Sequence, residues 1–492
     1  MITARAFAGK RYAVLGLARS GAAAVRALLA SGAEVLAWDE DEGRRNTILP
    51  ELARGGGPPA PAGGGGGEAA SLRFAAAPST AFGGPPPEDE LGEDFTLADP
   101  LHHDLTGYAG VIVSPGVPLN THPIKPHADS FGVPVIGDIE LFALARPELP
   151  PHKVVGITGT NGKSTTTALV HHILKTAGVP TLMGGNIGLP ILAQEPLPED
   201  GVYVLELSSF QIDLTFSLDC EVAVFLNITP DHLDRYESFE AYFESKARLF
   251  EMQSRDHYAL TGMTTPEPEE LLGRFDQVCY IAKEPHLLKL NKYPALRGMH
   301  NLENLAAASY VCRSVAIDLS ESAIEAGLKT FPGLPHRMEL VAEHEGVLFI
   351  NDSKATNQAS AAPALAAYPP ADGHPRIHWI VGGQAKEPGL AELADWTGHV
   401  AVAYTIGEAG PAFADLLAGR VVVERCGTLH AAVGRAAAAA RPGDVVLLSP
   451  ASASFDQFRD FEERGEMFRK YVADLFASGS TGRSPIGGSV PA

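Results

Sequence analysis

The strongest chemical signal in this sequence is a glycine-containing stretch between an apolar run and a helical pattern. Residues 154–165 read VVGITGTNGKST. The glycines would let backbone N–H groups close around phosphate oxygens, and the following helix would add its positive dipole end. Lys163 can reach the β- and γ-phosphates as a point charge, and the hydroxyl of Ser164 or Thr165 can coordinate Mg²⁺. The stretch therefore predicts an ATP-binding loop.

This loop departs in one respect from the usual spelling GxxxxGK[ST]. The residue six places before Lys163 is Ile157, and Gly156 comes one place earlier. The preceding strand and the following helix still favour ATP binding. The residues that we expect to bind ATP here are Gly159, Thr160, Asn161, Gly162, Lys163, Ser164 and Thr165.

Two further polar residues stand at the ends of apolar runs. Glu206 lies near the end of the run 202–207, and His232 follows the run 222–227. Parallel α/β sheets bind ligands at the carboxyl ends of their strands. A carboxylate opposite a triphosphate suits Mg²⁺, although a solvated glutamate is the alternative. A lone histidine is more often structural than a ligand, so the residues alone leave the role of His232 open.

Alternating strand and helix patterns must position these residues. Apolar runs separated by helical stretches predict an α/β protein with parallel or mostly parallel sheets covered by helices. A helix is expected over about 21–31, and the last helix from about Phe455, because phenylalanines recur there at helical spacing. The predicted strands are 12–16, 34–38, 109–114, 133–136, 153–158, 202–207, 222–227, 347–351, 377–382, 401–406, 421–424 and 445–449.

Composition and charge exclude several classes of protein. The 492 residues correspond to about three domains. The formal net charge of −21 argues against nucleic acid or an anionic membrane as the main partner. The four cysteines lack the spacing of a zinc site and are expected to be thiols. No signal peptide or membrane-spanning run is evident, so we expect a cytoplasmic protein.

Glycine and proline mark the expected domain boundaries. Residues 54–93 are so rich in both that we expect a flexible insertion on a surface loop. Prolines at 147, 150 and 151 suit a linker, and FPGLP at 331–335 suits a hinge. We therefore expect domains at 1–150, 151–333 and 334–480, and a disordered tail at 481–492.

The loop TGTNGKST resembles the ATP loop of the Mur ligase family. These enzymes use ATP to form amide bonds in peptidoglycan synthesis, and folylpolyglutamate synthase is a relative. The blocks MGGNIGLP, VLELSSFQ and LNITPDHLDRY resemble the members that add D-glutamate. The resemblance extends over nearly the whole chain apart from 54–93 and the tail, through GDIELF (137–142), MHNLEN (299–304), GLPHR (333–337), INDSKATN (350–357) and LLSPASASFDQFRDF (447–461).

The resemblance implies roles for residues of the first two domains. It implies that Lys163, Glu206, His232 and Lys246 are catalytic, and that Ser164, Glu206, His232 and a carbamylated Lys246 bind Mg²⁺, with two ions expected. It also implies that Asn301, Asn304, Arg337 and Asp352 bind ATP, with His300 nearby. The glycine turn at 16–21 has Ala18 in place of a middle glycine, which is weak support for a dinucleotide. In the family this turn holds a UDP-linked substrate, for which Ser20, Asp39, Glu40, Asn186 and Ser208 are the implied contacts.

The third domain is expected to bind the amino acid. The resemblance implies that D-glutamate contacts Lys354, Thr356, Lys386, Ser454, Phe455 and Phe461. The family commonly has Asp-Gly before the lysine at 386, where this chain has Gln384-Ala385. Phe461 is also expected in the core of the final helix as an alternative.

The family resemblance implies a Rossmann-like first domain, a P-loop ATPase-like central domain and a Rossmann-like third domain. It implies a ligase that joins D-glutamate to UDP-N-acetylmuramoyl-L-alanine through an acyl phosphate, with ATP and Mg²⁺. We expect a monomer that binds neither nucleic acid nor membrane. The alternatives are a sister ligase for another amino acid, a folylpolyglutamate synthase, a non-catalytic UDP-sugar or ATP sensor, and a dehydrogenase. The complete ATP loop argues against the dehydrogenase, and so does Ala18 in place of the middle glycine of the turn at 16–21.

Overall fold

The computed structural model of the chain describes ten stretches of the sequence. These are residues 1–53, 94–229, 235–263, 272–275, 277–281, 293, 296, 300–316, 319–385 and 389–478. The expected insertion at 54–93 and the expected tail at 481–492 lie outside them. So do His232 and Lys386, and the side chain of His300 is likewise not described.

The chain forms two compact units, each described separately below. Unit 1 consists of Met1–Lys163, Gly178–Ile281 and Arg313–Ile317. Unit 2 consists of Ser164–Ala177, Ala282–Cys312 and Asp318–Ala492. Two sheets belong to unit 1 and one sheet to unit 2.

The first sheet of unit 1 is parallel, in the order β3-β2-β1-β4-β5. Alternate residues of β1 pack into separate clusters: Tyr12 and Val14 join α1 and α4, whereas Ala13 and Leu15 join α3. This two-sided burial explains the continuous apolar runs in the sequence. The strands are β1 (Arg11–Leu15), β2 (Glu34–Trp38), β3 (Phe95–Leu97), β4 (Tyr108–Val113) and β5 (Val135–Ile136), and the helices are α1 (Arg19–Ala30), α2 (Glu42–Ala53), α3 (Ile124–Ser130) and α4 (Asp138–Ala145).

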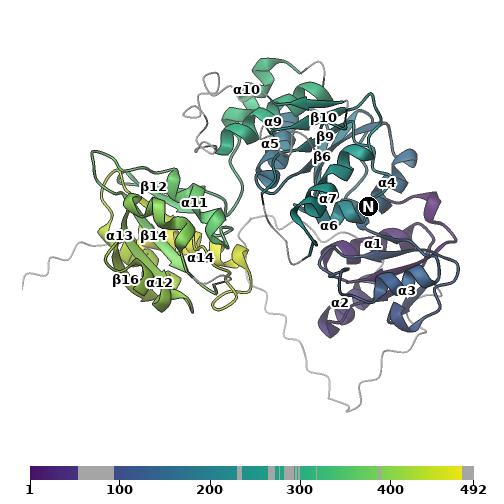
Figure 1. Cartoon of the computed structure of the whole chain (residues 1–492), viewed down its shortest axis with the longest axis horizontal. Helices are drawn as coiled ribbons and strands as arrows, with labels where there is room; N and C mark the ends of the chain where they lie inside the picture. The colour runs from purple at the N-terminus through teal and green to yellow at the C-terminus, as the bar shows by residue number, and fades with distance from the viewer. Residues whose placement is uncertain are drawn as a thin grey trace, which may run out of the picture. The chain divides into compact units, whose positions relative to one another are not determined.

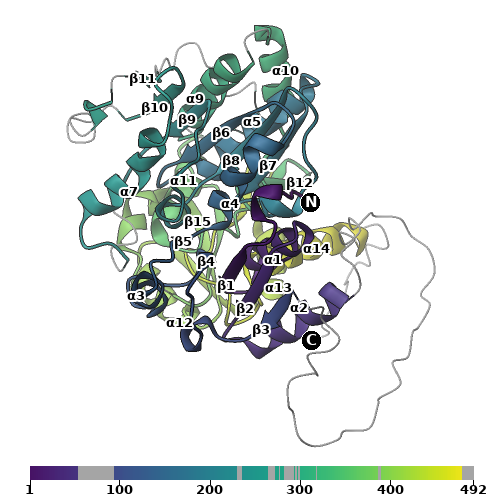
Figure 2. The same cartoon turned by 90° about the vertical axis from the view of Figure 1, so that its right-hand side faces the viewer.

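The second sheet of unit 1 is also parallel, in the order β11-β10-β9-β6-β8-β7. Strands β6 to β9 lie side by side in Figure 2. Because the pairing is parallel, the carboxyl ends of these strands meet at one edge. The strands are β6 (His152–Thr158), β7 (Thr181–Gly185), β8 (Gly201–Glu206), β9 (Val222–Phe225), β10 (Tyr258–Thr261) and β11 (Val278–Tyr280), and the helices of this stretch that belong to unit 1 are α6 (Ser209–Asp213) and α7 (Phe239–Glu251).

Unit 2 contains the third sheet, in the order β12-β13-β17-β14-β15-β16. Only β12 runs antiparallel to its neighbour. Buried residues of α11 and α12 cluster on one face and those of α13 and α14 on the other (Figure 1). The strands are β12 (Glu339–His344), β13 (Val347–Asn351), β14 (Ile377–Gly382), β15 (Val400–Ile406), β16 (Val422–Gly427) and β17 (Val445–Leu448), and the helices are α5 (Lys163–Thr176, whose first residue belongs to unit 1), α9 (His300–Val315), α10 (Glu321–Thr330), α11 (Gln358–Ala366), α12 (Gly410–Leu417), α13 (Leu429–Ala439) and α14 (Phe461–Ser478).

The predicted α/β fold with mostly parallel sheets is confirmed. All twelve predicted strands are present within a few residues of their expected bounds. The predicted start of the last helix is wrong, because α14 begins at Phe461 and Phe455 is 68% exposed in the preceding turn. None of the described helices is long and apolar enough to cross a membrane.

Candidate functional site

The predicted phosphate loop joins β6 to α5. Gly159 and Gly162 have φ values of +148° and +81°, which side chains other than glycine rarely tolerate. The Lys163 ammonium group donates hydrogen bonds to the carbonyl oxygens of Gly159 (2.8 Å) and Thr160 (2.9 Å). The lysine side chain is thus folded back over the loop.

Asn227, just beyond the end of β9, forms hydrogen bonds with the backbone of this loop. Its carbonyl oxygen accepts from the Thr160 N–H at 3.0 Å, and its side-chain oxygen accepts from the Asn161 N–H at 2.9 Å. Its Nδ2 donates to the Asn161 carbonyl at 3.1 Å. No role was predicted for Asn227 from the sequence, although the residue stands in the block LNITPDHLDRY.

Glu206 lies at the carboxyl end of β8, the neighbour of β6. Its side chain is 2% exposed, and its Oε1 accepts from Nδ2 of Asn186 at 3.1 Å. Its Oε2 is buried and has no hydrogen-bond partner among the residues that the structure describes. An orphaned carboxylate oxygen is costly in a protein interior and fits a position that a cation completes.

The turn after β7 holds Asn186 next to Glu206. The Asn186 N–H donates to the Glu206 carbonyl oxygen at 2.8 Å. A Cβ at Gly185 would lie 2.2 Å from the same oxygen, so only glycine fits there. This contact explains why the block MGGN carries glycine directly before the asparagine.

Lys246 on α7 reaches the same edge of the sheet from the other side of the loop. Its side chain is 2% exposed and its Nζ donates to the Gly159 carbonyl oxygen at 3.1 Å. The same Nζ lies 4.6 Å from the centre of the Tyr242 ring, and the Tyr242 hydroxyl is 3.3 Å from Oγ1 of Thr160. A helical lysine that the sequence alone would place in solvent is therefore buried against the phosphate loop.

The remaining predicted ATP contacts belong to unit 2. Asn304 on α9 accepts from Oγ1 of Thr166 at 3.2 Å and donates to Oδ1 of Asn301 at 3.0 Å. Arg337 donates from Nη2 to Oγ of Ser164 at 3.1 Å. The arginine of the block GLPHR thus contacts the first turn of α5, close in sequence to the phosphate loop. Thr165 is half-buried in that turn.

Asp352 follows β13 in the third sheet and is almost completely buried. Its Oδ2 accepts from the Ser449 hydroxyl at 2.8 Å, and its Oδ1 accepts from the Met338 N–H at 3.1 Å. Burial raises the pKa of Asp352 to about 7, against the opposing effects of these donors and of Arg337 and Arg464. The carboxyl group is therefore near its titration point at neutral pH.

The predicted D-glutamate residues cluster at the carboxyl ends of β13 and β17. The Lys354 ammonium lies 3.9 Å from the centre of the Phe461 ring, so Phe461 is half-buried beside a cation instead of filling the core. Ser454 is buried, whereas Phe455 is exposed. Thr356 is half-buried in the turn before α11.

Arg464 on α14 links the two loops that carry these residues. Its side chain is 1% exposed and donates to Oγ (2.9 Å) and the carbonyl oxygen (2.8 Å) of Ser353. It also donates to the carbonyl oxygens of Ser452 and Ala453 at 3.1 and 3.2 Å. This arginine was not predicted from the sequence, because a charged residue in a helix is usually solvated.

Replacement of Arg464 by lysine is expected to destabilise unit 2 by about 2–4 kcal/mol, because one ammonium group cannot satisfy both loops. Chemical denaturation would measure this loss of stability. Arg459→Lys is the matched control, since Arg459 is 80% exposed. Equal unfolding midpoints for the two variants would contradict this role of Arg464.

The glycine turn of the first sheet is also tightly constrained. A Cβ at Gly21 would lie 1.7 Å from the Gly16 carbonyl oxygen. Asp39 is buried, and its carboxylate accepts from the N–H groups of Leu17 (2.6 Å) and Asp41 (2.9 Å). Burial favours its neutral form, but these donors and Arg44 outweigh burial and lower the pKa of Asp39.

Asp39 therefore shapes the turn at the start of α1, while Glu40 beside it is exposed. Ser20 is half-buried in the first turn of α1, and no side chain of the described residues caps that helix. The free N–H groups of α1 suit an anion such as a pyrophosphate.

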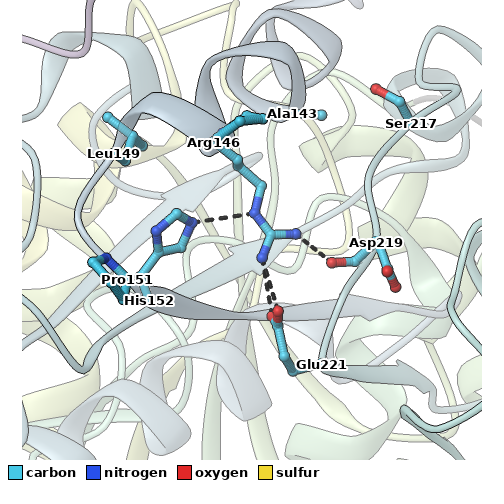
Figure 3. Close-up of a pocket in the computed structure, with 9 residues that line it drawn as sticks. Ala143, Arg146, Leu149, Pro151, His152, Ser217, Asp219 and Glu221 are labelled. Carbon is cyan, nitrogen blue, oxygen red and sulfur yellow. Dashed lines mark hydrogen bonds and ion pairs between the residues drawn. The ribbon is translucent and has the colours of Figure 1, made fainter.

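A hollow at the opposite edge of the second sheet does not have the character of a binding site (Figure 3). Arg146 pairs there with Glu221 at 2.9 Å, donates from Nε to Nε2 of His152 at 3.1 Å, and donates to the Asp219 carbonyl oxygen. Glu221 also accepts from the Val154 N–H. Because these groups satisfy one another, they join α4 to β6 and β9 as a structural cluster.

Two family models and several known proteins are similar to this chain. The Mur ligase middle domain matches residues 157–280, and the Mur ligase glutamate ligase domain matches residues 336–452. The chain is 55% identical to the UDP-N-acetylmuramoylalanine–D-glutamate ligase of Sphingopyxis alaskensis, over 97% of the chain and 100% of that protein. It is 54% identical to the protein of that name from Novosphingobium aromaticivorans, over 96% and 97%.

Solved structures share the fold at low identity. The UDP-N-acetylmuramate-alanine ligase of Thermotoga maritima matches with a TM-score of 0.53 and 16% identity, covering 95% of this chain and 99% of that one. The MurF ligase of the same organism, in complex with ADP, matches with a TM-score of 0.53 and 18% identity, covering 75% and 90%.

The fold and the site define an amide-forming ligase, and the chain belongs to the Mur ligase family. Within that family, it shares more than half of its residues with ligases named for D-glutamate. The predicted family resemblance is confirmed.

Proposed function

We propose that the chain uses ATP to join D-glutamate to UDP-N-acetylmuramoyl-L-alanine. The observation that carries this proposal is the full-length identity of 55% to a ligase named for that reaction. The carboxyl edge of the second sheet supports it, because four neighbouring strands place Asn227, the phosphate loop, Glu206 and Asn186 there.

The ATP phosphates would bind over the loop at 159–165. Its glycines permit the required backbone turn, and Lys163 would leave the loop carbonyls to contact the β- and γ-phosphates. On unit 2, Asn301, Asn304, Arg337 and Asp352 are the proposed nucleotide-side residues.

Mg²⁺ would be held by few protein groups. No cluster of three or more His, Cys, Asp or Glu side chains that could hold a metal occurs in the described part of the chain. Mg²⁺ is commonly bound through one or two carboxylates together with substrate phosphates. The orphaned Oε2 of Glu206 fits this pattern. When bound, Mg²⁺ would offset the negative charge that develops on the phosphoryl oxygens.

Ser164, His232 and Lys246 are the other proposed metal-side residues, with two ions expected. His232 lies outside the described residues. Lys246 is proposed to be carbamylated, as the family resemblance implies, which would convert its ammonium group into a carboxylate. The burial of Lys246 and the hydrogen bond from its Nζ to the Gly159 carbonyl oxygen support a role beside the phosphate loop.

The UDP-linked substrate is proposed to use residues of the first and second sheets, and D-glutamate residues of the third. The uncapped start of α1 would bind the UDP pyrophosphate, with Ser20, Asp39, Glu40, Asn186 and Ser208 as contacts. The carboxyl ends of β13 and β17 would bind D-glutamate through Lys354, Thr356, Lys386, Ser454, Phe455 and Phe461.

The proposed reaction has two steps. The alanyl carboxylate oxygen of the UDP-linked substrate attacks the γ-phosphorus, and the bond to the leaving ADP oxygen breaks to give an acyl phosphate. The neutral amine of D-glutamate then attacks the acyl carbon, phosphate leaves, and the nitrogen loses a proton. Lys163 stabilises the charge on the γ-phosphoryl oxygens during the first step.

We also propose the domain division at 1–150, 151–333 and 334–480, a monomeric state, and a cytoplasmic location, where ATP and UDP-linked precursors are available.

Mass spectrometry tests the proposed ligase reaction directly. Incubation with UDP-N-acetylmuramoyl-L-alanine, ATP, Mg²⁺ and D-glutamate should give a product heavier by one glutamyl residue. A UDP-linked substrate recovered unchanged would contradict the proposal.

A further inference from the structure

An arginine in the glycine turn of the first sheet contacts a loop of the second sheet. Arg19 is the first residue of α1, and its Nη2 donates to the Gly188 carbonyl oxygen at 2.6 Å. Gly188 lies in the β7 loop, residues 186–190, which directly follows β7. Its φ of +72° lets the chain turn at this point. The contact joins residues 169 positions apart, so it depends on the packing of the two sheets and not on the local sequence.

Residues of the second sheet hold the two ends of the β7 loop. At its start, Asn186 bonds to both the carbonyl oxygen and the carboxylate of Glu206. Near its end, Nε2 of Gln194 donates to the Leu189 carbonyl oxygen at 3.0 Å. Arg19 contacts the loop between these two points. A shift in the middle of the loop would therefore reach Asn186 and the turn beside Glu206.

The packing of α1 places Arg19 firmly against this loop. The β7 loop leads into the short helix η5 (Ile191–Ala193), and η5 packs against α1. Buried residues of α1, such as Ala24 and Leu28, belong to the same hydrophobic cluster as Ile191 and Leu192. Because α1 and η5 share one core, the glycine turn and the β7 loop are held together from below. A guanidinium that donates to a carbonyl oxygen adds a charge-assisted hydrogen bond to this packing.

We propose that Arg19 is a positioning residue, which holds the β7 loop in register with the glycine turn for a substrate that spans both sheets. This inference rests on the proposed function, in which the UDP pyrophosphate binds at the start of α1 and Asn186 contacts the same substrate. The contact with Gly188 would keep these two parts of the binding site at a fixed separation. Arg19 touches no reacting atom.

The substitution Arg19→Met tests the proposal, because methionine removes the donors and keeps most of the apolar stem. The Kd for UDP-N-acetylmuramoyl-L-alanine should rise about tenfold, the effect of losing one hydrogen bond to a charged group. The Kd for UDP alone should stay within about twofold, since this fragment would use only the glycine turn. Calorimetric titration without ATP measures both constants in the absence of turnover.

Arg255→Met is the matched control. Arg255 is exposed in the turn between α7 and β10, at the opposite edge of the second sheet from the β7 loop. It should leave both dissociation constants unchanged. An equal loss of affinity for UDP and for the whole substrate in Arg19→Met would overturn the proposal, because Arg19 would then contact the nucleotide directly. Unchanged affinity for both would also overturn it.

Hydrogen exchange of the Asn186 amide separates this inference from the proposed function. In the free protein this N–H donates to the Glu206 carbonyl oxygen at 2.8 Å. At one pH it should exchange about tenfold faster in Arg19→Met than in wild type, and at the wild-type rate in Arg255→Met. Equal exchange in wild type and Arg19→Met would overturn the positioning role even in an active ligase. A chain with the predicted exchange that binds no UDP-linked substrate would reject the proposed function and keep the hold of Arg19 on the β7 loop.

Discussion

Replacement of Lys163 by alanine is expected to lower kcat at least about 100-fold, which is typical for the loss of one positioned charge in a transition state. The Lys163 ammonium group lies over the phosphate loop, bonded to the carbonyl oxygens of Gly159 and Thr160. In the proposed reaction no other described group of the loop can supply this charge. Release of phosphate from ATP, in the presence of both other substrates, measures the effect.

Lys175→Ala is the control for this prediction. Lys175 is an exposed residue at the other end of α5, so its loss should leave turnover within about twofold. Unfolding temperatures of both variants should be compared, because Lys163 also bonds to its own loop. A folded Lys163→Ala variant with near-normal turnover would refute the assignment of the phosphate loop.

Replacement of Glu206 by glutamine is expected to lower kcat by about two to three orders of magnitude, because it removes the buried charge proposed to bind Mg²⁺. Glutamine has nearly the same shape and could still accept from Asn186, so the fold should survive. The Mg²⁺ concentration for half-maximal activity should rise at the same time. A titration of activity with Mg²⁺ measures both effects.

Glu199→Gln is the matched control, since Glu199 is exposed in the turn before β8. It should leave the Mg²⁺ titration unchanged. If Glu206→Gln loses activity but keeps the wild-type Mg²⁺ dependence, Glu206 does not bind the metal.

The sequence predicted the elements with strong apolar patterns and missed the weak ones. Strands such as β6 and β14 are buried on both faces and therefore form continuous apolar runs. The missed strands include β7, which contains two glycines, and β12, an antiparallel edge strand in which no residue is fully buried. Their pairing depends on partners far away in the chain, which a local pattern does not contain.

Some residues of the candidate site could likewise be predicted from the sequence, and others could not. The phosphate loop could be predicted because glycine and lysine occur there at a mechanistically required spacing. Asn227 and Arg464 could not, since each acts through a tertiary contact: Asn227 with the loop backbone, and Arg464 with two sheet-edge loops. The start of the last helix was misplaced because the phenylalanines at 455 and 458 continue the helical spacing in a segment that forms a turn.

In the proposed reaction, this ligase couples ATP cleavage to the addition of D-glutamate. The most direct test is phosphate release from ATP and Mg²⁺ with UDP-N-acetylmuramoyl-L-alanine, comparing D-glutamate with L-glutamate, L-alanine, lysine and diaminopimelate. We expect sustained phosphate release with D-glutamate alone. Sustained release with another amino acid and none with D-glutamate would contradict the proposed specificity, and no release with any of them would contradict the proposed catalysis.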